Sequence, residues 1–171
     1  IFASPPTWIA GSLQFANYAV LFKDGDAITV WNSLVVAGIS TVIAMLLGTI
    51  AAYSLARFRT GGQPFSLSVL GTQMLPPVAL VIPFYLLAQR FGLLDKGWAL
   101  AVIFLSFNLP FVVWILIGFF QGIPQELEEA AMIDGCSRLR ILTHILLPLM
   151  GPAIASTGLL AFILSWNEFL F

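Results

Sequence analysis

Charged side chains are scarce in this sequence of 171 residues: Asp, Glu, Lys and Arg make up 9% of it, and hydrophobic residues make up 60%. Seven Lys and Arg against eight Asp and Glu leave a formal net charge of −1. A soluble domain typically has about a quarter charged residues and under half apolar ones. The composition excludes an ordinary soluble globule, a disordered chain and a protein that binds nucleic acid through positive charge. It indicates an integral membrane protein surrounded by lipid.

Cysteine and histidine are almost absent. The single cysteine, Cys136, excludes a disulfide framework and a Cys-rich metal site. The single histidine, His144, has no acidic or cysteine partner at metal-ligand spacing and gives no credible nucleophile–base pair. We therefore expect no catalytic residue and no metal site. The sequence also has no Gly-x-x-x-x-Gly-Lys-Ser/Thr pattern, so we expect the chain to hold no nucleotide itself.

The few charges fall in groups that are separated by long apolar runs. Each run can hold one membrane-spanning helix of about 20 residues, but not two. The sequence predicts an all-α fold, a polytopic transmembrane helical bundle in one domain, with spans over residues 31–56, 65–89, 98–120 and 148–171. Residues 1–30 are expected to form an external loop with Trp8 and Tyr18 as interfacial anchors, or the exit of a preceding helix.

Basic residues in the short loops suggest an orientation. Arg57 and Arg59 precede the second span, and Arg138 and Arg140 precede the fourth. The other ends of the spans hold three basic residues, namely Lys23, Arg90 and Lys96. The excess is small, but it favours a cytoplasmic position for residues 57–64 and 121–147.

The loop over residues 121–147 is too long for a simple connection and contains helix signals. Pro124 followed by three glutamates predicts a helix over residues 125–134, which Gly135 ends in a left-handed conformation. The apolar side of this helix is expected to hold Leu127, Ala130, Ala131 and Ile133, with the acids opposite. Ser137 is expected to cap a second helix that bends or ends near Pro148. Two short helices outside the bilayer suit docking on a soluble partner.

The same loop resembles the EAA loop of permease subunits of binding-protein-dependent ABC importers. The resemblance rests on Glu129-Ala130-Ala131, Asp134-Gly135 and Ile145-Leu146-Leu147-Pro148 at the family's spacing. Three further runs are similar to the carbohydrate-uptake branch, which includes the maltose permease subunits: Trp31-Asn32-Ser33, Met74-Leu75-Pro76-Pro77 with Pro83, and Ser165-Trp166-Asn167-Glu168-Phe169. Cys136 departs from the pattern, since the family often has alanine there.

The resemblance implies a function and a set of partners. The chain would be a multi-pass permease subunit that moves a sugar or oligosaccharide across a bacterial or archaeal cytoplasmic membrane. It would work with cytoplasmic ATP-binding cassette ATPase subunits, a second permease chain and an extracytoplasmic solute-binding protein. ATP and Mg would bind the ATPase, and this chain would carry no cofactor. The residues implied in ATPase coupling are Glu129, Ala130, Ala131, Asp134, Gly135, Ile145, Leu147 and Pro148.

The resemblance also bears on the ends of the chain. The family has about six spans, and this chain starts at Ile1 without a methionine and stops at Phe171 inside an apolar run. We therefore expect an internal fragment that lacks one helix at each end.

Prolines within the predicted spans mark a candidate translocation pathway, since broken membrane helices often line a cavity. The candidate residues are Gln73, Met74, Pro76, Pro77, Pro83 and Asn108. The alternative for the prolines is a kink that serves packing alone. Asn108 could bond either a sugar hydroxyl or a neighbouring helix, with the second favoured. Glu168 is the one acid well inside a predicted span, and its role stays open.

Two other functions fit a membrane bundle. A secondary transporter would need no ATPase, but it would need paired charges or ion ligands within the membrane, for which Glu168 alone is a poor basis. A membrane scaffold without transport would not need a structured, acid-headed loop. Co-purification with a nucleotide-hydrolysing subunit would separate the importer from both.

Overall fold

A computed structural model describes residues 26–58 and 60–168 of the chain. It divides into two compact units, Ile1–Ser33 and Leu34–Phe171, and the described part of the first is the beginning of helix α2. Trp8, Tyr18, Lys23, Arg59 and Phe169 lie outside the described residues. Helix α2 starts at Asp26, so the last residues of the predicted external loop are helical.

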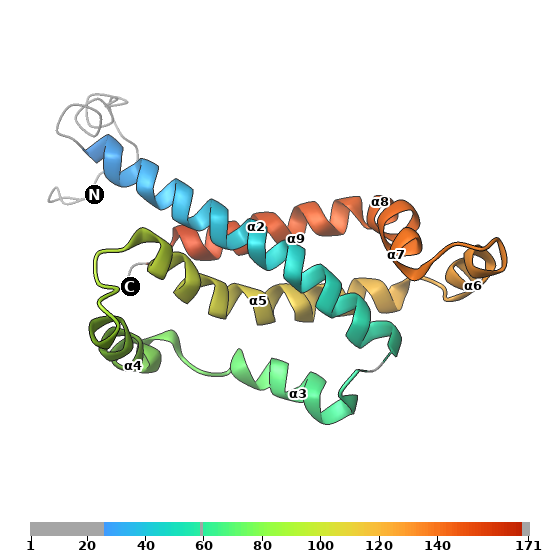
Figure 1. Ribbon diagram of the computed structural model, residues 1–171, viewed down its shortest axis with the longest axis horizontal. Helices are drawn as coiled ribbons and strands as arrows, with labels where there is room; N and C mark the ends of the chain where they lie inside the picture. Colours follow the sequence, from blue (N-terminus) through green and yellow to red (C-terminus); the bar gives the residue numbers. More distant parts are fainter. Residues whose placement is uncertain (1–25, 59, 169–171) are drawn as a thin grey trace, which may run out of the picture. The chain divides into compact units, whose positions relative to one another are not determined.

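The described residues contain helices and no strand, which confirms the predicted all-α fold. The long helices are α2 (Asp26–Phe58) and α5 (Gly97–Gly122), and α3 (Gly62–Thr72) and α4 (Pro77–Arg90) lie between them in the chain. The remaining segments are α6 (Glu126–Ile133), α7 (Arg138–Ile141), the π-helical turn η1 (Leu142–Leu146), α8 (Leu147–Leu149) and α9 (Gly151–Trp166) (Figure 1).

Two of the four predicted spans coincide with long single helices. Helix α2 contains residues 31–56, and α5 contains residues 98–120. Both helices are long and apolar enough to cross a bilayer. Pro110 lies inside α5 without ending it.

A single helix over residues 65–89 does not form. The segment consists of α3 and α4, and the break falls at residues 73–76. Pro76 is extended, at φ −66° and ψ 130°, and α4 starts at Pro77. A proline disfavours a helical conformation of the residue before it and lacks the N–H that a helix interior needs, so Pro76-Pro77 ends one helix and starts the next. The prolines had indicated an interruption of this span, and the structure places the break at Pro76-Pro77, whereas Pro83 lies inside α4.

The predicted fourth span also differs in its beginning. The helical segment Arg138–Leu149 meets Gly151–Trp166 at an angle of 79°, so the two form a bent pair. The break lies at Met150, between Pro148 in α8 and Pro152 at the start of α9. The long apolar helix therefore starts at Gly151, not at Pro148.

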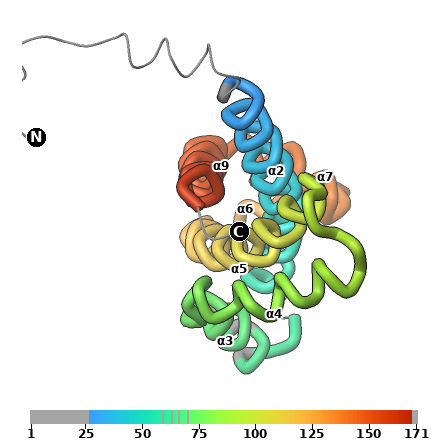
Figure 2. Tube along the Cα trace, turned by 90° about the vertical axis from the view of Figure 1, so that its left-hand side faces the viewer, coloured from blue at the N-terminus to red at the C-terminus, as the bar shows by residue number. Residues whose placement is uncertain are grey.

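Helix α5 is the centre of the Leu34–Phe171 unit. It packs against α9 and α3 (Figure 2), and its residues Val112, Leu116 and Phe120 are fully buried in a core shared with α2. Helices α2 and α5 approach closely at Gly48, where an added Cβ would lie 2.6 Å from Val112 Cγ1. Small residues allow such close contacts between membrane helices, where the hydrophobic effect contributes little.

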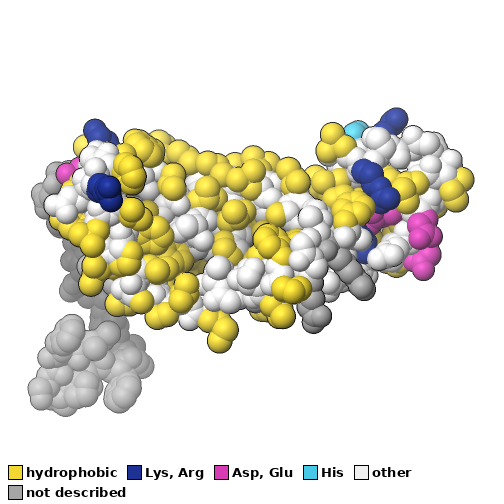
Figure 3. All heavy atoms as spheres, turned by 60° about the horizontal axis from the view of Figure 1, so that its bottom comes forward, with side chains coloured by type: hydrophobic (Ala, Val, Ile, Leu, Met, Phe, Trp, Pro, Cys, Tyr) yellow, Lys and Arg dark blue, Asp and Glu magenta, His cyan; other side chains and the backbone are white. Residues whose placement is uncertain are grey.

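The surface of this unit carries its charges at the ends. In Figure 3, apolar side chains cover the middle of the visible face, and basic and acidic side chains gather at its two ends, one of them over α6 and α7. Helix α4 has no buried residue and exposes Val78, Ile82 and Tyr85. A large apolar surface of this kind is typical of contact with lipid or with another membrane chain.

Candidate functional site

The predicted two-helix loop lies between α5 and α9. Helix α6 spans Glu126–Ile133, close to the predicted 125–134, and three glutamates occupy its first turn. Gly135 has a φ of +83°. Its N–H donates to the Met132 carbonyl at 3.0 Å, and the Cys136 N–H donates to the Ala131 carbonyl at 2.9 Å. This is the Schellman arrangement of hydrogen bonds, for which glycine is the preferred residue. The predicted left-handed joint is confirmed.

The second predicted helix is also confirmed, with an internal irregularity. Ser137 is extended, and its Oγ accepts from the Arg140 N–H at 3.4 Å, as expected of a cap. The helix continues through η1, where the Leu147 N–H donates to the Leu142 carbonyl in a wider turn. Pro148 follows this turn and has no N–H to donate, so the regular hydrogen-bond pattern cannot pass through it. Ile141, Leu142 and Leu146 anchor the segment in the core.

The face that α6 buries differs from the predicted one. Leu127, Ala130 and Ile133 are exposed, and Ile133 is 87% exposed. The buried residues of α6 are Ala131 and Glu128, which is 3% exposed. The prediction that the apolar residues pack inward and the acids face away is therefore wrong for three of the four apolar residues and for one acid.

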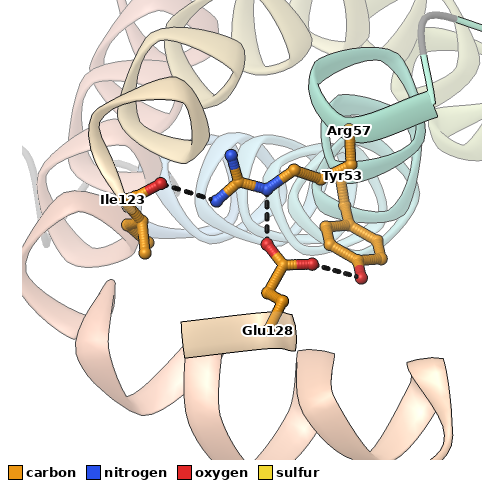
Figure 4. Close-up of polar contacts among 4 residues, drawn as sticks. All are labelled: Tyr53, Arg57, Ile123 and Glu128. Atoms are coloured by element: carbon orange, nitrogen blue, oxygen red, sulfur yellow. Dashed lines mark hydrogen bonds and ion pairs between the residues drawn. The ribbon is translucent and has the colours of Figure 1, made fainter. Parts of the chain in front are cut away.

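Glu128 is buried because Arg57 meets it there (Figure 4). The Arg57 Nε donates to Glu128 Oε1, and the two side chains are 5% and 4% exposed. The Tyr53 hydroxyl donates to Glu128 Oε2 at 3.0 Å. Arg57 Nη2 donates to the carbonyl of Ile123, the residue that caps the C-terminal end of α5, at 2.9 Å. A buried charge is tolerated when it is paired and hydrogen-bonded in this way.

Two aromatic rings lie beside Tyr53, which bonds to this ion pair. The Tyr53 ring lies 5.5 Å from that of Phe120, which is fully buried, and 5.6 Å from that of Phe58. The Arg138 guanidinium of α7 lies 4.9 Å from the centre of the Phe58 ring, within cation–π distance. The C-terminal ends of α2 and α5 therefore meet α6 and α7 at one place. We name Tyr53, Arg57, Ile123 and Glu128 the joint cluster.

The residues expected in ATPase coupling separate into two groups. Glu129, Ala130, Asp134 and Gly135 are exposed on and beside α6, whereas Ala131 is buried. In the second helix, Ile145 and Leu147 are half-buried and pack against the core, and Pro148 is exposed. The residues on and beside α6 thus form a mostly exposed surface, and those of the second helix hold the loop on the bundle.

The candidate pathway residues lie outside the two-helix loop. Gln73, in the break between α3 and α4, donates to the Phe107 carbonyl at 3.2 Å, and Met74 beside it is 85% exposed. Pro76 and Pro77 form the break, and Pro83 lies inside α4.

Asn108 of α5 is buried and donates to Ser165 Oγ of α9 at 2.6 Å. Ser165 Oγ lies 3.4 Å from Ser40 Oγ of α2. Of the two expected roles of Asn108, the bond to a neighbouring helix is the one present. Glu168 follows the end of α9 at Trp166. A role of these residues in a pathway stays a prediction.

A comparison with known protein families supports the resemblance that the loop pattern suggested. Residues 44–171 match the family described as "Binding-protein-dependent transport system inner membrane component". The chain belongs to this family. The resemblance expected from the loop pattern is thereby confirmed, and the chain is a membrane protein.

Several relatives of the family are similar over most of this chain. The chain is 36% identical over 168 residues to the sulfoquinovosyl glycerol transport system permease protein SmoH of Agrobacterium fabrum, with 97% of the chain and 59% of the relative covered. It is 35% identical over 179 residues to the trehalose/maltose transport system permease protein MalG of Thermococcus litoralis, with 99% and 64% covered. The chain thus spans about three fifths of the length of these relatives.

A solved structure shares the fold. It is a bacterial ABC transporter involved in the import of the acidic polysaccharide alginate, with a TM-score of 0.63 and 29% identity, and the match covers 91% of this chain and 55% of that one. The fold is therefore that of an ABC importer permease.

The joint cluster was missed in the sequence because its two charges have other plausible roles. Arg57 counted as an orientation signal, and Glu128 as one of three first-turn acids. One signal was available: Tyr53 and Arg57 are four residues apart, so both lie on one face of α2. That spacing suggests one shared partner for the two side chains, but the sequence does not say which residue supplies it.

Gly135→Val should loosen the loop. A Cβ at Gly135 meets nothing within 4 Å, so the cost is backbone strain at φ +83° and no clash. A left-handed conformation costs a residue with a side chain about 1–2 kcal/mol, and more when it is β-branched. Trypsin cleavage after Arg138 and Arg140, which needs local unfolding of α7, should become about five to thirty times faster.

Gly135→Asn is the control, since asparagine tolerates the left-handed region. It should be cleaved at close to the rate of the original protein. Equal cleavage of the valine variant and the original protein would contradict the joint described for Gly135.

Proposed function

We propose that this chain is the transmembrane permease subunit of an ABC importer that moves a sugar or oligosaccharide across the cytoplasmic membrane of a bacterium or archaeon. Family membership supports this proposal. So do the relatives, which are named for sulfoquinovosyl glycerol, trehalose/maltose and maltodextrin transport. The subunit itself is not an enzyme, since ATP and Mg bind a separate ATPase.

The observation that carries the proposal is the exposed outer surface of α6. An eight-residue helix with Glu129 and Ala130 exposed lies beyond the ends of α2 and α5 (Figure 1). Small residues such as Ala130 let another backbone approach closely, and an exposed carboxylate offers a partner for a basic residue. The end of the bundle that holds Arg57, α6 and α7 would lie in the cytoplasm, where the ATPase subunit would dock on this surface.

The mechanism follows from this docking. Two ATPase subunits that close on ATP would draw together the α6 helices of this chain and of a second permease chain. The bundles would then tilt from an inward-open to an outward-open state. An extracytoplasmic solute-binding protein would deliver the sugar on the other side. The break between α3 and α4, with Gln73 and Met74, is the candidate part of the pathway in this chain.

The orientation can be tested with Cys136, the one thiol of the chain, which is partly exposed. A membrane-impermeant maleimide should label Cys136 in inside-out vesicles and leave it unlabelled in intact cells. The labelling should fall when the ATPase subunits are bound, because Cys136 directly follows the proposed docking helix. Labelling from the outside would overturn the orientation, and the docking proposal with it.

The docking proposal predicts that Glu129→Lys uncouples the subunit from its ATPase. Glu129 is exposed, so the reversal should cost the bundle little stability. If its carboxylate pairs with a basic residue in a partly desolvated cleft, the loss is about 2 to 5 kcal/mol at the interface. Binding of the ATPase to the full-length permease should weaken accordingly, and the remaining ATP hydrolysis should no longer respond to sugar-loaded binding protein.

Glu126→Lys is the matched control. It changes the same charge in the same turn of α6, and Glu126 is also exposed, but the loop pattern places no requirement on it. An exposed charge of this kind contributes about 0–1 kcal/mol. The measurements are ATPase affinity and stimulated hydrolysis in reconstituted vesicles with maltose, trehalose and maltotriose. Near-normal values for both variants would remove Glu129 from the mechanism.

A further inference from the structure

Helix α6 has few contacts that could hold it on the bundle. Its fully buried side chains are Glu128 and Ala131, and its other residues are exposed or half-buried. An isolated helix of eight residues is not stable in water, because the cost of its first turn is recovered only over longer segments. The position of α6 therefore depends on the peptide connections at its ends, on the packing of Ala131 and Met132 against the core and on what Glu128 contacts.

Glu128 contacts the ends of the two long helices at once. Arg57 and Tyr53 of α2 both donate to its carboxylate, one to each oxygen. Arg57 also donates to the Ile123 carbonyl at the C-terminal end of α5. One arginine thus bridges α2, α5 and α6 (Figure 4).

The chemistry of this contact makes it rigid. Apolar contacts are non-directional, so two helices held by them alone can slide past each other. Charge-assisted hydrogen bonds fix both distance and orientation. If α6 moved away from α2, it would leave the Arg57 and Glu128 charges buried and unpaired, which is strongly unfavourable. A buried ion pair is not needed for stability, since apolar residues often serve as well; what it adds here is a fixed geometry.

We propose that the Arg57–Glu128 ion pair transmits displacement of α6 to the ends of α2 and α5. This inference rests on the proposed function, in which an ATPase moves α6. Glu129 would contact the ATPase, whereas Arg57, Glu128 and Tyr53 would be positioning residues that make α6 and the long helices move as one body. Adjacent glutamates on α6 would then have different roles, one facing the partner and one facing the bundle.

The test is a distance between spin labels on α6 and α2. Ile133→Cys and Leu47→Cys are suitable sites, since both residues are exposed and the loop pattern leaves both positions free. The labels are placed in the full-length chain with Cys136→Ser. The complex with the ATPase is measured without nucleotide and after trapping with MgATP and vanadate. The distance should stay the same on trapping. In Glu128→Gln it should shift, because α6 then moves without α2.

Glu126→Gln is the control and should behave as the original protein does. An equal shift in the original protein and in Glu128→Gln would overturn the proposed role of the Arg57–Glu128 ion pair. An unchanged distance in Glu128→Gln would overturn it as well. If Glu128→Gln does not insert in the membrane, Arg57→Lys replaces it, because lysine keeps the charge but lacks the guanidinium that reaches both Glu128 and Ile123. Arg90→Lys, at an exposed position in the last turn of α4, is its control. The distance should shift on trapping in Arg57→Lys and not in Arg90→Lys, and identical behaviour would overturn the proposal.

The same labels separate this inference from the proposed function. In the permease alone, without ATPase or nucleotide, Glu128→Gln should already broaden the distance distribution, because α6 has lost its anchor. If no ATPase binds the original protein, the proposed function is contradicted, and the broadening still tests whether Glu128 holds α6 on the bundle. If the ATPase binds and the distribution stays narrow in Glu128→Gln, the role of the ion pair is contradicted and the proposed function stands.

Discussion

A buried ion pair between Arg57 and Glu128 determines how helix α6 is attached to the ends of the long helices. Two charges that are about 95% buried must keep their partner, since removal of one partner of such a pair costs about 3–5 kcal/mol. This requirement brings α6 against the end of α2, and the Arg57 bond to Ile123 brings in the end of α5. The exposed residues of α6, which include Glu129, are consequently held in a fixed position relative to α2 and α5.

The rest of the molecule follows the rules of a protein in lipid. Close approach at Gly48 and Val112 and a polar contact between Asn108 and Ser165 connect α2, α5 and α9, where apolar side chains gain little by leaving lipid for one another. Charged side chains lie at the ends of the bundle. The Arg57–Glu128 ion pair is at the end that carries the loop, where it links the membrane helices to the proposed docking surface.

The sequence predicted those features whose determinants are local. A proline, three acids, Gly135 and the cap at Ser137 lie within fifteen residues of each other, roughly four helical turns, so the two-helix loop was predictable. The interruption of the second span also had a local signal in its prolines, but these did not show that Pro76-Pro77 ends a helix while Pro83 lies inside one. The burial of Glu128 was not predictable, because its partner Arg57 lies 71 residues away in the chain. The sequence does not distinguish which of the three neighbouring glutamates packs against α2.

The coupling free energy between Arg57 and Glu128 tests the account most directly. It can be obtained from hydrogen exchange of the α6 amides in the purified chain, for Arg57→Gln, Glu128→Gln and the double variant. Close charge pairs that are desolvated couple by about 1.5 kcal/mol or more. We predict a value in this range, with the double variant less destabilised than the sum of the single ones. Effects that add within about 0.5 kcal/mol would show that the two residues act independently and would contradict the account.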